Sequence, residues 1–435
     1  MTDIQIGLSA LGVLLALLAL RVPIAIALTA VSFAGMWLMI GWNVAWGALG
    51  IMPYGFAANW VLSSVPMFLL LGYICYHTEL TAGLFRAARL WLSGLPGGLA
   101  ISAILGSSGF AAVCGSSVAC SAAMGRIAVP EMLAAKYHPQ LATGTVAVAG
   151  TIGALIPPSI IMILYAVIAQ VPVSALFLGG IGVGVISAIG YILVVLIRVK
   201  LNPSLAPRVD EHPSMSERMS ALQDTWPIIL IMVGIFGGLF SGVFTPTEAG
   251  AVGAFLATIV AAIKRSLTWK RFSLAIVETL KTTGTLIFIA VGATLFTRFL
   301  TLSGTGEYIS SSIIDFGGSP AMLILSIVIV YLLIGMFLEP VGAMLLTLPI
   351  VMPVVDGAGL SLIWFGVLLT KLLEIGMITP PIGMNVFVIK SVVGNTIQLT
   401  DIFKGVLWFM IMDLAVVLLI SAVPQIVLVL AQYGM

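Results

Sequence analysis

Long apolar runs are the feature of this sequence that most constrains its fold. The runs from Ile4 to Leu20 and from Val406 to Leu430 approach or exceed the roughly 20 residues that a helix needs to cross a hydrocarbon core. A membrane β-barrel would instead show segments of about ten residues with alternating hydrophobicity. Only 8% of the 435 residues are charged and 61% are hydrophobic, whereas about a quarter of an ordinary soluble domain is charged. The sequence therefore predicts an all-α protein that crosses the membrane several times.

Charge, cysteine content and missing motifs exclude several classes of function. The net charge is only +2 and no basic stripe with interleaved aromatic residues is present, so nucleic-acid binding is not indicated. No Gly-x-x-x-x-Gly-Lys-Ser/Thr segment occurs, which excludes ATP use through a P-loop. Cys75, Cys114 and Cys120 lie in apolar stretches and are interpreted as small buried hydrophobic residues. Met1 to Leu20 lacks the basic start of a cleavable signal, so the first helix is expected to be retained.

Two apolar runs are interrupted by the same pattern, Gly-x-x-x-Pro-Pro-x. The first interruption covers Gly153 to Ser159 and the second covers Gly376 to Ile382, 223 residues further on. Irregular backbone is not tolerated against lipid, so each break must face protein or a water-filled cavity. Before each break lies a segment that predicts two half-helices joined at a tip, which is Cys114 to Ser117 in the first case and Glu339 to Ala343 in the second.

These features recur in the same order, so the chain is predicted to consist of two repeats. The first repeat is 1–200, with a re-entrant hairpin at about 98–126 and a broken helix at about 141–170; a linker follows at 201–224. The second repeat is 225–435, with a hairpin at about 320–357 and a broken helix at about 361–393. Each repeat is expected to make five full crossings, and this odd number implies that the two repeats have inverted topology.

The basic residues give an orientation, because cytoplasmic loops are enriched in Lys and Arg. If the basic segment from Lys264 to Lys281 is cytoplasmic, its first-repeat counterpart, Gly41 to Trp60, lies in the periplasm; that segment has three Trp and no Lys or Arg. Both termini are then periplasmic, and Arg298 and Lys371 are the exceptions among 18 basic residues. The 16 cytoplasmic residues are Arg21, Arg86, Arg89, Arg126, Lys136, Arg198, Lys200, Arg208, Arg218, Lys264, Arg265, Lys270, Arg271, Lys281, Lys390 and Lys404.

The breaks are suited to bind ions and carboxylates. A half-helix N-terminus offers free N–H groups and partial positive charge to a carboxylate, whereas free carbonyls and hydroxyls suit a small hard cation such as Na⁺. The candidate substrate-binding residues are Ser116, Ser117, Ser159, Gly342, Thr379 and Asn385. The candidate Na⁺ ligands are Gly115, Ser117, Thr151, Gly153, Pro157, Pro340, Gly342, Gly376 and Thr379. The alternative is that these small residues only let helices pack closely.

Several motifs together resemble a known family. They are Gly109-Phe-Ala-Ala-Val-Cys-Gly-Ser-Ser-Val-Ala119, Val129-Pro-Glu-Met132, Ile156-Pro-Pro-Ser159, Leu176-Phe177, Thr245-Pro-Thr-Glu-Ala-Gly250, Gly335-Met-Phe-Leu-Glu-Pro340 and Glu374-Ile-Gly-Met-Ile-Thr-Pro-Pro-Ile-Gly-Met-Asn385. In this set and order, over essentially the whole chain, the sequence resembles the large membrane subunit of tripartite ATP-independent periplasmic (TRAP) transporters, the DctM family. It departs from the family pattern at Cys114, Arg126, Val183 and Glu339, and the change at Cys114 puts a side-chain role there in ion binding in doubt.

The resemblance implies a function and a set of partners. It implies Na⁺-driven import of an organic acid, such as a C4-dicarboxylate, a sugar acid or sialic acid, across the bacterial inner membrane by an elevator-type movement. A periplasmic binding protein would deliver the substrate, and a small four-helix membrane subunit would be a separate chain. The main alternative is a stand-alone Na⁺/carboxylate symporter that needs no binding protein.

A charge in mid-membrane is a functional candidate by default. Lys371 and Glu374 lie three residues apart and are predicted to neutralise each other, with a role of Lys371 toward the substrate carboxylate as the alternative. Glu339 is expected either to cap a half-helix or to tune the cation site. Asp413 is expected to pair with a neighbour or with the small subunit, and Arg298 is a weaker candidate for attracting an anion at the outer mouth.

One further charge has a local structural explanation, and the sequence disfavours two rival functions. Thr245 and Glu248 form a capping-box pattern with Pro246 between them. Gly106-Ser-Ser-Gly109 matches a motif of intramembrane serine proteases, but His77, His138 and His212 all fall at helix ends or in charged loops and leave Ser108 without a base. A channel would need rings of residues that line a continuous pore, whereas the sequence predicts two re-entrant hairpins that enter the membrane from opposite sides.

Overall fold

The computed structural model describes residues 2–207, 213–315 and 320–434, so Arg208 and His212 lie outside the described residues. These residues form helices and connecting segments, with no β-strand among them. The first half contains α1 (Asp3–Ala19), α2 (Ile24–Ile40), α3 (Trp42–Ala57), α4 (Ser64–His77), α5 (Ala82–Leu92), α6 (Gly98–Cys114), α7 (Ser117–Ala134), α8 (Pro139–Ala149), α9 (Ile160–Ala169) and α10 (Val173–Leu201). The second half contains α11 (Met215–Gln223), α12 (Trp226–Phe240), α13 (Pro246–Ile263), α14 (Trp269–Leu302), α15 (Thr305–Asp315), α16 (Pro320–Gly335), α17 (Pro340–Gly357), α18 (Leu362–Gly376), α19 (Met384–Val393), α20 (Leu399–Ala422) and α21 (Gln425–Ala431).

The helices fit a polytopic membrane protein. Within the described ranges, six helical segments are long and apolar enough to cross a membrane, or seven if the bent pair of α11 and α12 is one span. Helices α6, α9, α16 and α19 are apolar but shorter. These short helices belong to the hairpins and the broken helices, as expected where a span is interrupted.

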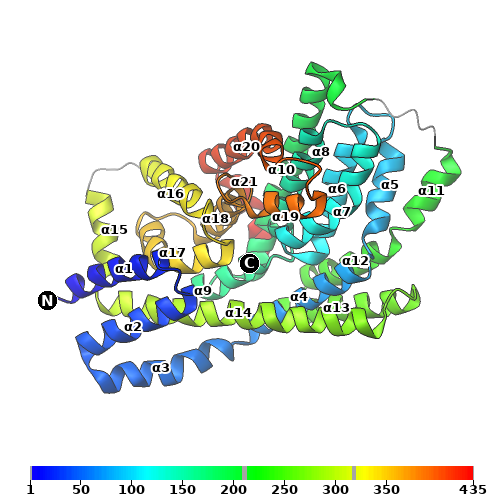
Figure 1. The fold of residues 1–435 in the computed structure, drawn as a ribbon. Helices are drawn as coiled ribbons and strands as arrows, with labels where there is room; N and C mark the ends of the chain where they lie inside the picture. Colours follow the sequence, from blue (N-terminus) through cyan, green and yellow to red (C-terminus); the bar gives the residue numbers. More distant parts are fainter. Residues whose placement is uncertain (1, 208–212, 316–319, 435) are drawn as a thin grey trace.

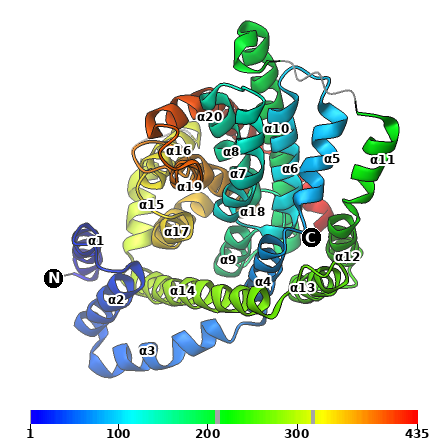
Figure 2. The same ribbon diagram turned by 45° about the vertical axis from the view of Figure 1, so that its right-hand side comes forward.

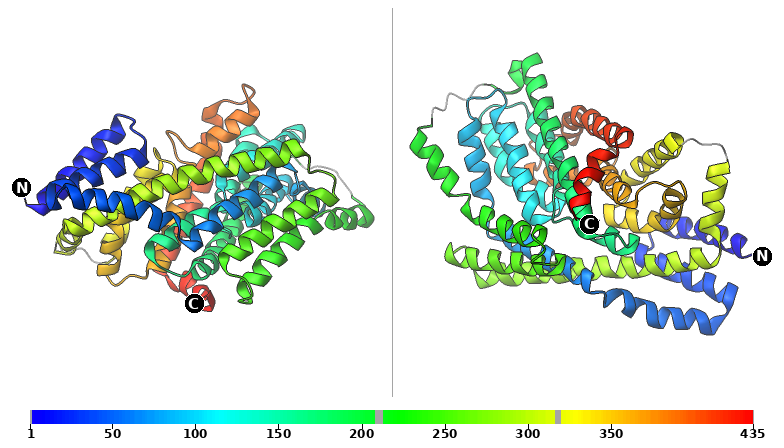
Figure 3. Two further views of the ribbon diagram at one scale, coloured as in Figure 1. Left: turned by 90° about the horizontal axis from the view of Figure 1, so that it is seen from below. Right: turned by 180° about the vertical axis from the view of Figure 1, so that it is seen from behind.

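The helices form two groups (Figures 1 and 2). Helices α1–α4 and α12–α14 form a framework along one side, which α14 crosses as a single helix of 34 residues. Seen from below, α14 runs over the face of the molecule with α2 and α13 beside it (Figure 3, left). The hairpins, the broken helices, α10 and α20 form a central group above the framework. The two groups meet along α4 and α14.

Each half of the central group has the same order of elements. A hairpin (α6–α7 or α16–α17) is followed by a broken helix (α8–α9 or α18–α19) and then by a long helix (α10 or α20). The first broken helix passes through a short 3-10 helix, η2 (Gly150–Ala154), before its Pro-Pro pair. Both Pro-Pro bonds, Pro157–Pro158 and Pro380–Pro381, are cis. Since proline lacks the N–H that a continuing helix needs, each span stops there.

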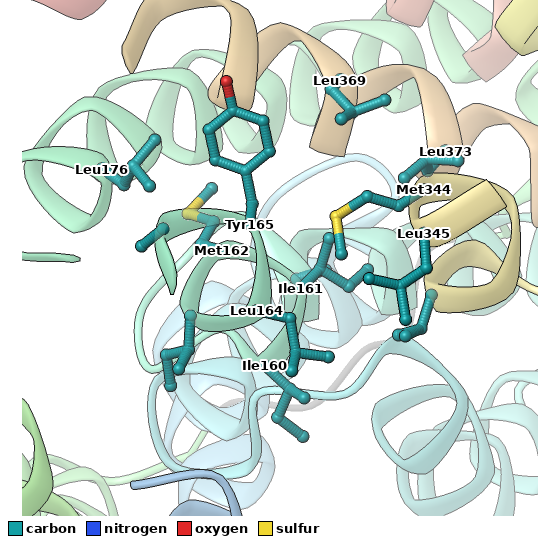
Figure 4. Close-up of a cluster of buried hydrophobic side chains, with 14 of the residues drawn as sticks. Ile160, Ile161, Met162, Leu164, Tyr165, Leu176, Met344, Leu345, Leu369 and Leu373 are labelled. Atoms are coloured by element: carbon teal, nitrogen blue, oxygen red, sulfur yellow. The ribbon is translucent and has the colours of Figure 1, made fainter. Parts of the chain in front are cut away.

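The two repeats exchange helices. The second half of each broken helix packs against the hairpin of the other repeat: α9 lies against α17, and α19 lies against α7. In Figure 4, Ile161 and Leu164 of α9 lie in one apolar cluster with Met344 of α17 and Leu373 of α18. The Tyr165 hydroxyl also donates to the Leu362 carbonyl oxygen at the start of α18, at 2.6 Å. Neither repeat therefore has a complete core by itself.

Some segments between the predicted spans are helical. The segment from Gly41 to Trp60, expected as a periplasmic segment between spans, contains α3. This helix begins directly after Gly41, whose backbone has a positive φ of 94°. The apolar runs do not predict helices α5 and α15 either, and the linker contains α11. Short amphipathic segments such as α5 are held by neighbours, here by packing against α6 with Phe85 buried. Ion pairs from Arg86 to Asp224 and from Arg89 to Glu131, each at 2.9 Å, lie at its surface. The apolar-run pattern detects spans but not helices of this kind.

Candidate functional site

A cavity of about 130 Å³ lies where the two hairpin tips, the two broken helices and the framework meet. It is lined by Leu69, Gly72, Tyr73, Cys114, Gly115, Ser116, Ser117, Val118, Ala119, Ala154, Ile160, Ile161, Thr282, Leu286, Glu339, Pro340, Val341, Glu374, Met377 and Met384. Both repeats therefore contribute to one site, as the repeated breaks suggested. Ser116, Ser117, Gly115 and Pro340 are the predicted binding residues that line it directly.

The first hairpin tip is built around Gly115. Gly115 has a left-handed backbone (φ 64°), which a residue without a side chain adopts readily, and it ends α6. Ser116 then caps α7 by accepting from the Ala119 N–H at 3.4 Å. The Ser117 hydroxyl donates to Oε1 of Glu374 on α18, at 3.1 Å. This hydrogen bond joins the first hairpin to the second broken helix.

The first break packs directly on this tip. A Cβ added at Gly153 would lie 3.1 Å from the carbonyl carbon of Ser116, so a side chain there would push the two segments slightly apart. Pro157 is buried in the break, and Ser159 caps α9 by accepting from the Met162 N–H at 3.3 Å. Thr151 does not face the cavity, because its hydroxyl donates to the Val148 carbonyl oxygen and lies 3.1 Å from the Tyr191 hydroxyl.

At the second hairpin, Glu339 caps α17. Its carboxylate accepts from the Gly342 N–H at 2.9 Å, and Pro340 occupies the first helical position. The capping interpretation of Glu339 is thereby confirmed. Gly342 is buried in this first turn, beside the cavity rather than in its lining.

The second break packs on the second hairpin, and Gly376 provides the contact. A Cβ there would lie 2.6 Å from the Gly335 backbone, so these two glycines hold α18 against α16. The Thr379 hydroxyl donates to the Ile375 carbonyl oxygen at 2.6 Å. Asn385 is buried and donates to the Ala147 carbonyl oxygen at 3.4 Å. The N-terminus of α19, after Gly383, has no side-chain cap.

The predicted pairing of Lys371 with Glu374 is wrong. The two side chains leave α18 toward different neighbours: Lys371 bonds to Asp413 of α20 at 2.5 Å, while Glu374 reaches Ser117. An oppositely charged carboxylate on a packed neighbouring helix is the better partner for a buried ammonium, so the spacing within α18 does not decide the pairing. Asp413 thus pairs within the chain, which was one of its two expected alternatives. Arg298 is exposed on α14 and does not line the cavity.

The capping box at α13 is confirmed. The Thr245 hydroxyl accepts from the Glu248 N–H at 3.4 Å, and the Glu248 carboxylate accepts from the Thr245 N–H at 2.8 Å. Glu248 therefore has a local structural role.

Sequence reasoning missed several polar residues around the site. Tyr73 and Thr282 line the cavity from the framework, and their hydroxyl oxygens lie 2.8 Å apart. The Ser121 hydroxyl is buried without a partner among the described residues, close to Gly150 of the first break. Tyr73 and Ser121 lie inside uninterrupted helices, so no break marked them. The available signal is helical spacing: Tyr73 lies four residues after Leu69, and Ser121 lies four residues after Ser117, and both Leu69 and Ser117 line the cavity.

Oxygen atoms without partners gather near the two breaks. Within the described part of the chain, Oε2 of Glu374, Oδ1 of Asn385 and Oγ of Ser121 are buried and accept no hydrogen bond. Buried polar atoms are nearly always satisfied in native proteins. The described residues contain no group of three or more His, Cys, Asp or Glu side chains that could hold a metal. Any ion held here would therefore use hydroxyl, amide and backbone oxygens with at most one or two carboxylates.

The arrangement of two hairpins and two broken helices around one cavity defines a membrane-transporter fold. The YdaH transporter of Alcanivorax borkumensis, described as having an unusual topology, has a similar fold with a TM-score of 0.63, 15% sequence identity and coverage of 88% of each chain.

The sequence comparisons specify the family. Residues 11–426 match the family model described as "Tripartite ATP-independent periplasmic transporter, DctM component", and the chain belongs to this family. It is 35% identical to the C4-dicarboxylate TRAP transporter large permease protein DctM of Pseudomonas aeruginosa, over 89% of this chain and 90% of that protein. It is 30% identical to the sialic acid permease SiaM of Vibrio cholerae, over 86% and 87%. Identity is also 30% to the 2,3-diketo-L-gulonate permease YiaN of Escherichia coli, over 96% and 97%. The chain is a multi-pass membrane protein of a transporter family, in agreement with the resemblance of its motifs.

Proposed function

We propose that this large permease subunit imports an organic acid, of the C4-dicarboxylate, sugar-acid or sialic-acid type, with Na⁺ as the coupling ion. The relatives named above are permeases for a C4-dicarboxylate, sialic acid and 2,3-diketo-L-gulonate. The cavity between the hairpin tips is the proposed binding site. Helix α7 begins at its wall, and Met384 of the uncapped helix α19 lines it too, so two helix N-termini are available to a carboxylate.

The observation that carries Na⁺ coupling is the unpartnered Oε2 of Glu374 in the cavity wall. Glu339 lines the same cavity. When these carboxyl groups are ionised, a substrate carboxylate next to them would be repelled unless a cation neutralised part of the charge. Binding of the organic anion would then depend on Na⁺, which is the thermodynamic requirement for coupling.

Two cation sites are proposed, one at each break. The first would use oxygens of the hairpin tip and the first break, at Gly115, Ser117, Thr151, Gly153 and Pro157, and the unpartnered Ser121 hydroxyl supports a ligand there. The second would use oxygens at Pro340, Gly342, Gly376 and Thr379, beside Oδ1 of the Asn385 side-chain amide, which has no hydrogen-bond partner among the described residues. Ser116, Ser117, Ser159, Gly342, Thr379 and Asn385 remain the proposed substrate contacts. Of these, Ser116 and Ser117 line the cavity, and the other four would act from behind its wall.

We also propose that the central group moves as a body against the framework. The cavity lies where these groups meet, with Tyr73 and Thr282 on the framework side and the hairpin tips on the other. A displacement of the central group along α4 and α14 would carry the site from one side of the membrane to the other, as in an elevator-type transporter. Inverted repeats make such alternating access natural, because exchanging their conformations exchanges the open side.

The proposed partners and location follow the family. A periplasmic binding protein would deliver the acid, and a small membrane subunit would be a separate chain. The complex would lie in the bacterial inner membrane, with both termini of this chain in the periplasm. A stand-alone symporter is the competing outcome.

The test is Na⁺-stimulated uptake of radiolabelled acid in proteoliposomes, with and without the binding protein. The combined variant Ser117→Ala and Gly153→Ala should lose most Na⁺ stimulation. Gly284→Ala on α14 is the matched control, since an added Cβ there meets no atom within 4 Å. Gly179 is a poorer control because a Cβ there would lie 2.8 Å from Val427. Equal losses in variant and control would refute the site, and normal uptake without the binding protein would refute the tripartite assembly.

A further inference from the structure

A second polar centre lies outside the cavity, between the second broken helix and the last long helix of each repeat. The Lys371 ammonium of α18 donates to Asp413 Oδ1 of α20 at 2.5 Å, to the Ser187 hydroxyl of α10 at 3.1 Å and to the Tyr191 hydroxyl at 3.3 Å. All four side chains are buried, and the exposed fraction is 0% for Lys371 and 1% for Asp413. None of them lines the cavity.

The groups around the ammonium are those of a site for a hard cation. They are a carboxylate, an aliphatic hydroxyl and a phenol oxygen, drawn from two helices, and oxygen ligands of this kind suit alkali and alkaline-earth ions. The Tyr191 hydroxyl donates to Asp413 Oδ1 at 2.6 Å, which leaves its lone pairs toward the ammonium. The other carboxylate oxygen, Oδ2 of Asp413, has no partner within the described part of the chain. The single ammonium therefore does not contact every oxygen atom that these side chains offer.

We propose that the Lys371 ammonium is a built-in cation, which fills an alkali-ion type of site formed by Ser187, Tyr191 and Asp413. The positive charge that this site requires is thus covalently fixed to α18 and is not exchanged during a transport cycle. The site is distinct from the two proposed Na⁺ sites at the breaks, and the inference does not depend on them.

The position of the site explains what the fixed cation does. It ties α18 to α10 and α20, and the Tyr191 hydroxyl continues the chain of contacts to Thr151 in the first broken helix, at 3.1 Å. Through Lys371 and Tyr191, the two broken helices are linked by polar contacts that do not pass through the cavity. Because the Lys371 ammonium is part of the chain, this link is present whether or not Na⁺ is bound. The two broken helices therefore stay packed when the transporter holds neither Na⁺ nor substrate.

The test removes the ammonium and offers an ion from solution in its place. In Lys371→Met, the thermal unfolding temperature of the purified protein should fall below that of the wild type at low alkali-ion concentration. It should then rise by at least about 2 °C for a tenfold increase in Na⁺ or K⁺, beyond the wild-type response, with N-methylglucamine keeping the ionic strength constant. The double variant Lys371→Met and Asp413→Asn keeps both breaks intact but has no charge to balance, so it should respond as the wild type does.

A second single variant guards against failure to fold. Lys371→Gln keeps a donor toward Asp413 but removes the charge, and it should show the same additional ion response. No additional response in either single variant, or the same response in the double variant, would overturn the proposal. Because cells supply alkali ions in excess, loss of both single variants during expression would also overturn it, whether or not the double variant folds.

Discussion

Glu374 and Lys371 are separated by less than one turn of α18, but they belong to different centres. Glu374 accepts a hydrogen bond from the hydroxyl of Ser117 in the cavity wall, and Lys371 contacts residues of α10 and α20. A buried charge is costly unless it is paired, so each residue is held where a partner on another helix approaches it. Spacing along one helix could identify these residues as candidates, but it could not assign their partners, because those partners are 257 and 42 residues away.

The free oxygen of Glu374 leads to a prediction at the level of one residue. Glu374→Gln keeps the hydrogen bond with Ser117 possible and removes the negative charge from the cavity wall. The Na⁺ concentration for half-maximal uptake should therefore rise roughly tenfold, which corresponds to losing about 1.4 kcal/mol of attraction. The measurement is initial uptake in proteoliposomes over a range of Na⁺ concentrations.

The matched control is Glu248→Gln at the start of α13. Glutamine also serves in a capping box, and this residue lies outside the cavity, so the Na⁺ dependence should stay as in the wild type. An unchanged Na⁺ dependence in Glu374→Gln would show that this carboxylate does not contribute to cation binding.

At the level of helices, pairs of glycines set how closely neighbouring helices pack, both between the repeats and within the second repeat. Gly144 of α8 lies against Gly405 of α20, and Gly335 of α16 lies against Gly376 of α18. Without a strong hydrophobic driving force between helices in lipid, close backbone contact through small residues becomes the main source of association. These contacts join the first half of each broken helix to its neighbour.

Gly144→Ala should destabilise the protein through this contact. The new Cβ would lie 2.5 Å from the carbonyl carbon of Gly405, so α8 and α20 must separate, at a cost of about 1 to 3 kcal/mol. The apparent melting temperature in detergent should fall by several degrees. Gly284→Ala, with open space around its Cβ, should leave it unchanged or raise it slightly. A Gly144→Ala variant as stable as Gly284→Ala would contradict the close contact.

Elements with a strong local signal could be predicted from the sequence, and elements held by neighbours could not. Gly and Pro inside an apolar run locate the breaks, because they stop a helix wherever it lies, and η2 and Gly383 fall within the expected segments. Helix α5 packs instead against α6 with Phe85 buried, and its ion pairs reach Asp224 and Glu131; no local pattern reveals these neighbours. The cavity lining contributed by Tyr73 and Thr282 depends on how α4 and α14 pack, and it required the whole fold.

At the level of the whole molecule, the framework and the central group touch at the first hairpin tip. Gly72 of α4 is next to Cys114, and a Cβ at Gly72 would lie 3.2 Å from the Cys114 sulfur. Cys114 is a free, buried cysteine. If the central group moves past α4 during transport, this contact must break in each cycle.

Gly72→Cys should therefore permit a disulfide to Cys114 that stops transport. The short distance is compatible with disulfide geometry once α4 shifts slightly to relieve its contact with the Cys114 carbonyl oxygen. After mild oxidation, uptake should fall to background, and dithiothreitol should restore it. Gly72→Ser introduces a side chain of similar size without the cross-link, and its uptake should not respond to oxidant or reductant. Full uptake by the cross-linked protein, verified by mass spectrometry, would exclude the proposed movement.

The length of α14 has a consequence for the membrane itself. With a rise of about 1.5 Å per residue, its 34 residues extend about 51 Å, well beyond a hydrocarbon core of about 30 Å. Lys270, Arg271 and Lys281 mark the part suited to the headgroups, and Thr282 and Leu286 of the apolar remainder reach the cavity. Because α14 is one continuous helix, it fixes the distance between the residues suited to the headgroups and the residues that line the cavity. Bilayer thickness, through hydrophobic mismatch, thereby becomes one of the determinants of how deep that site sits.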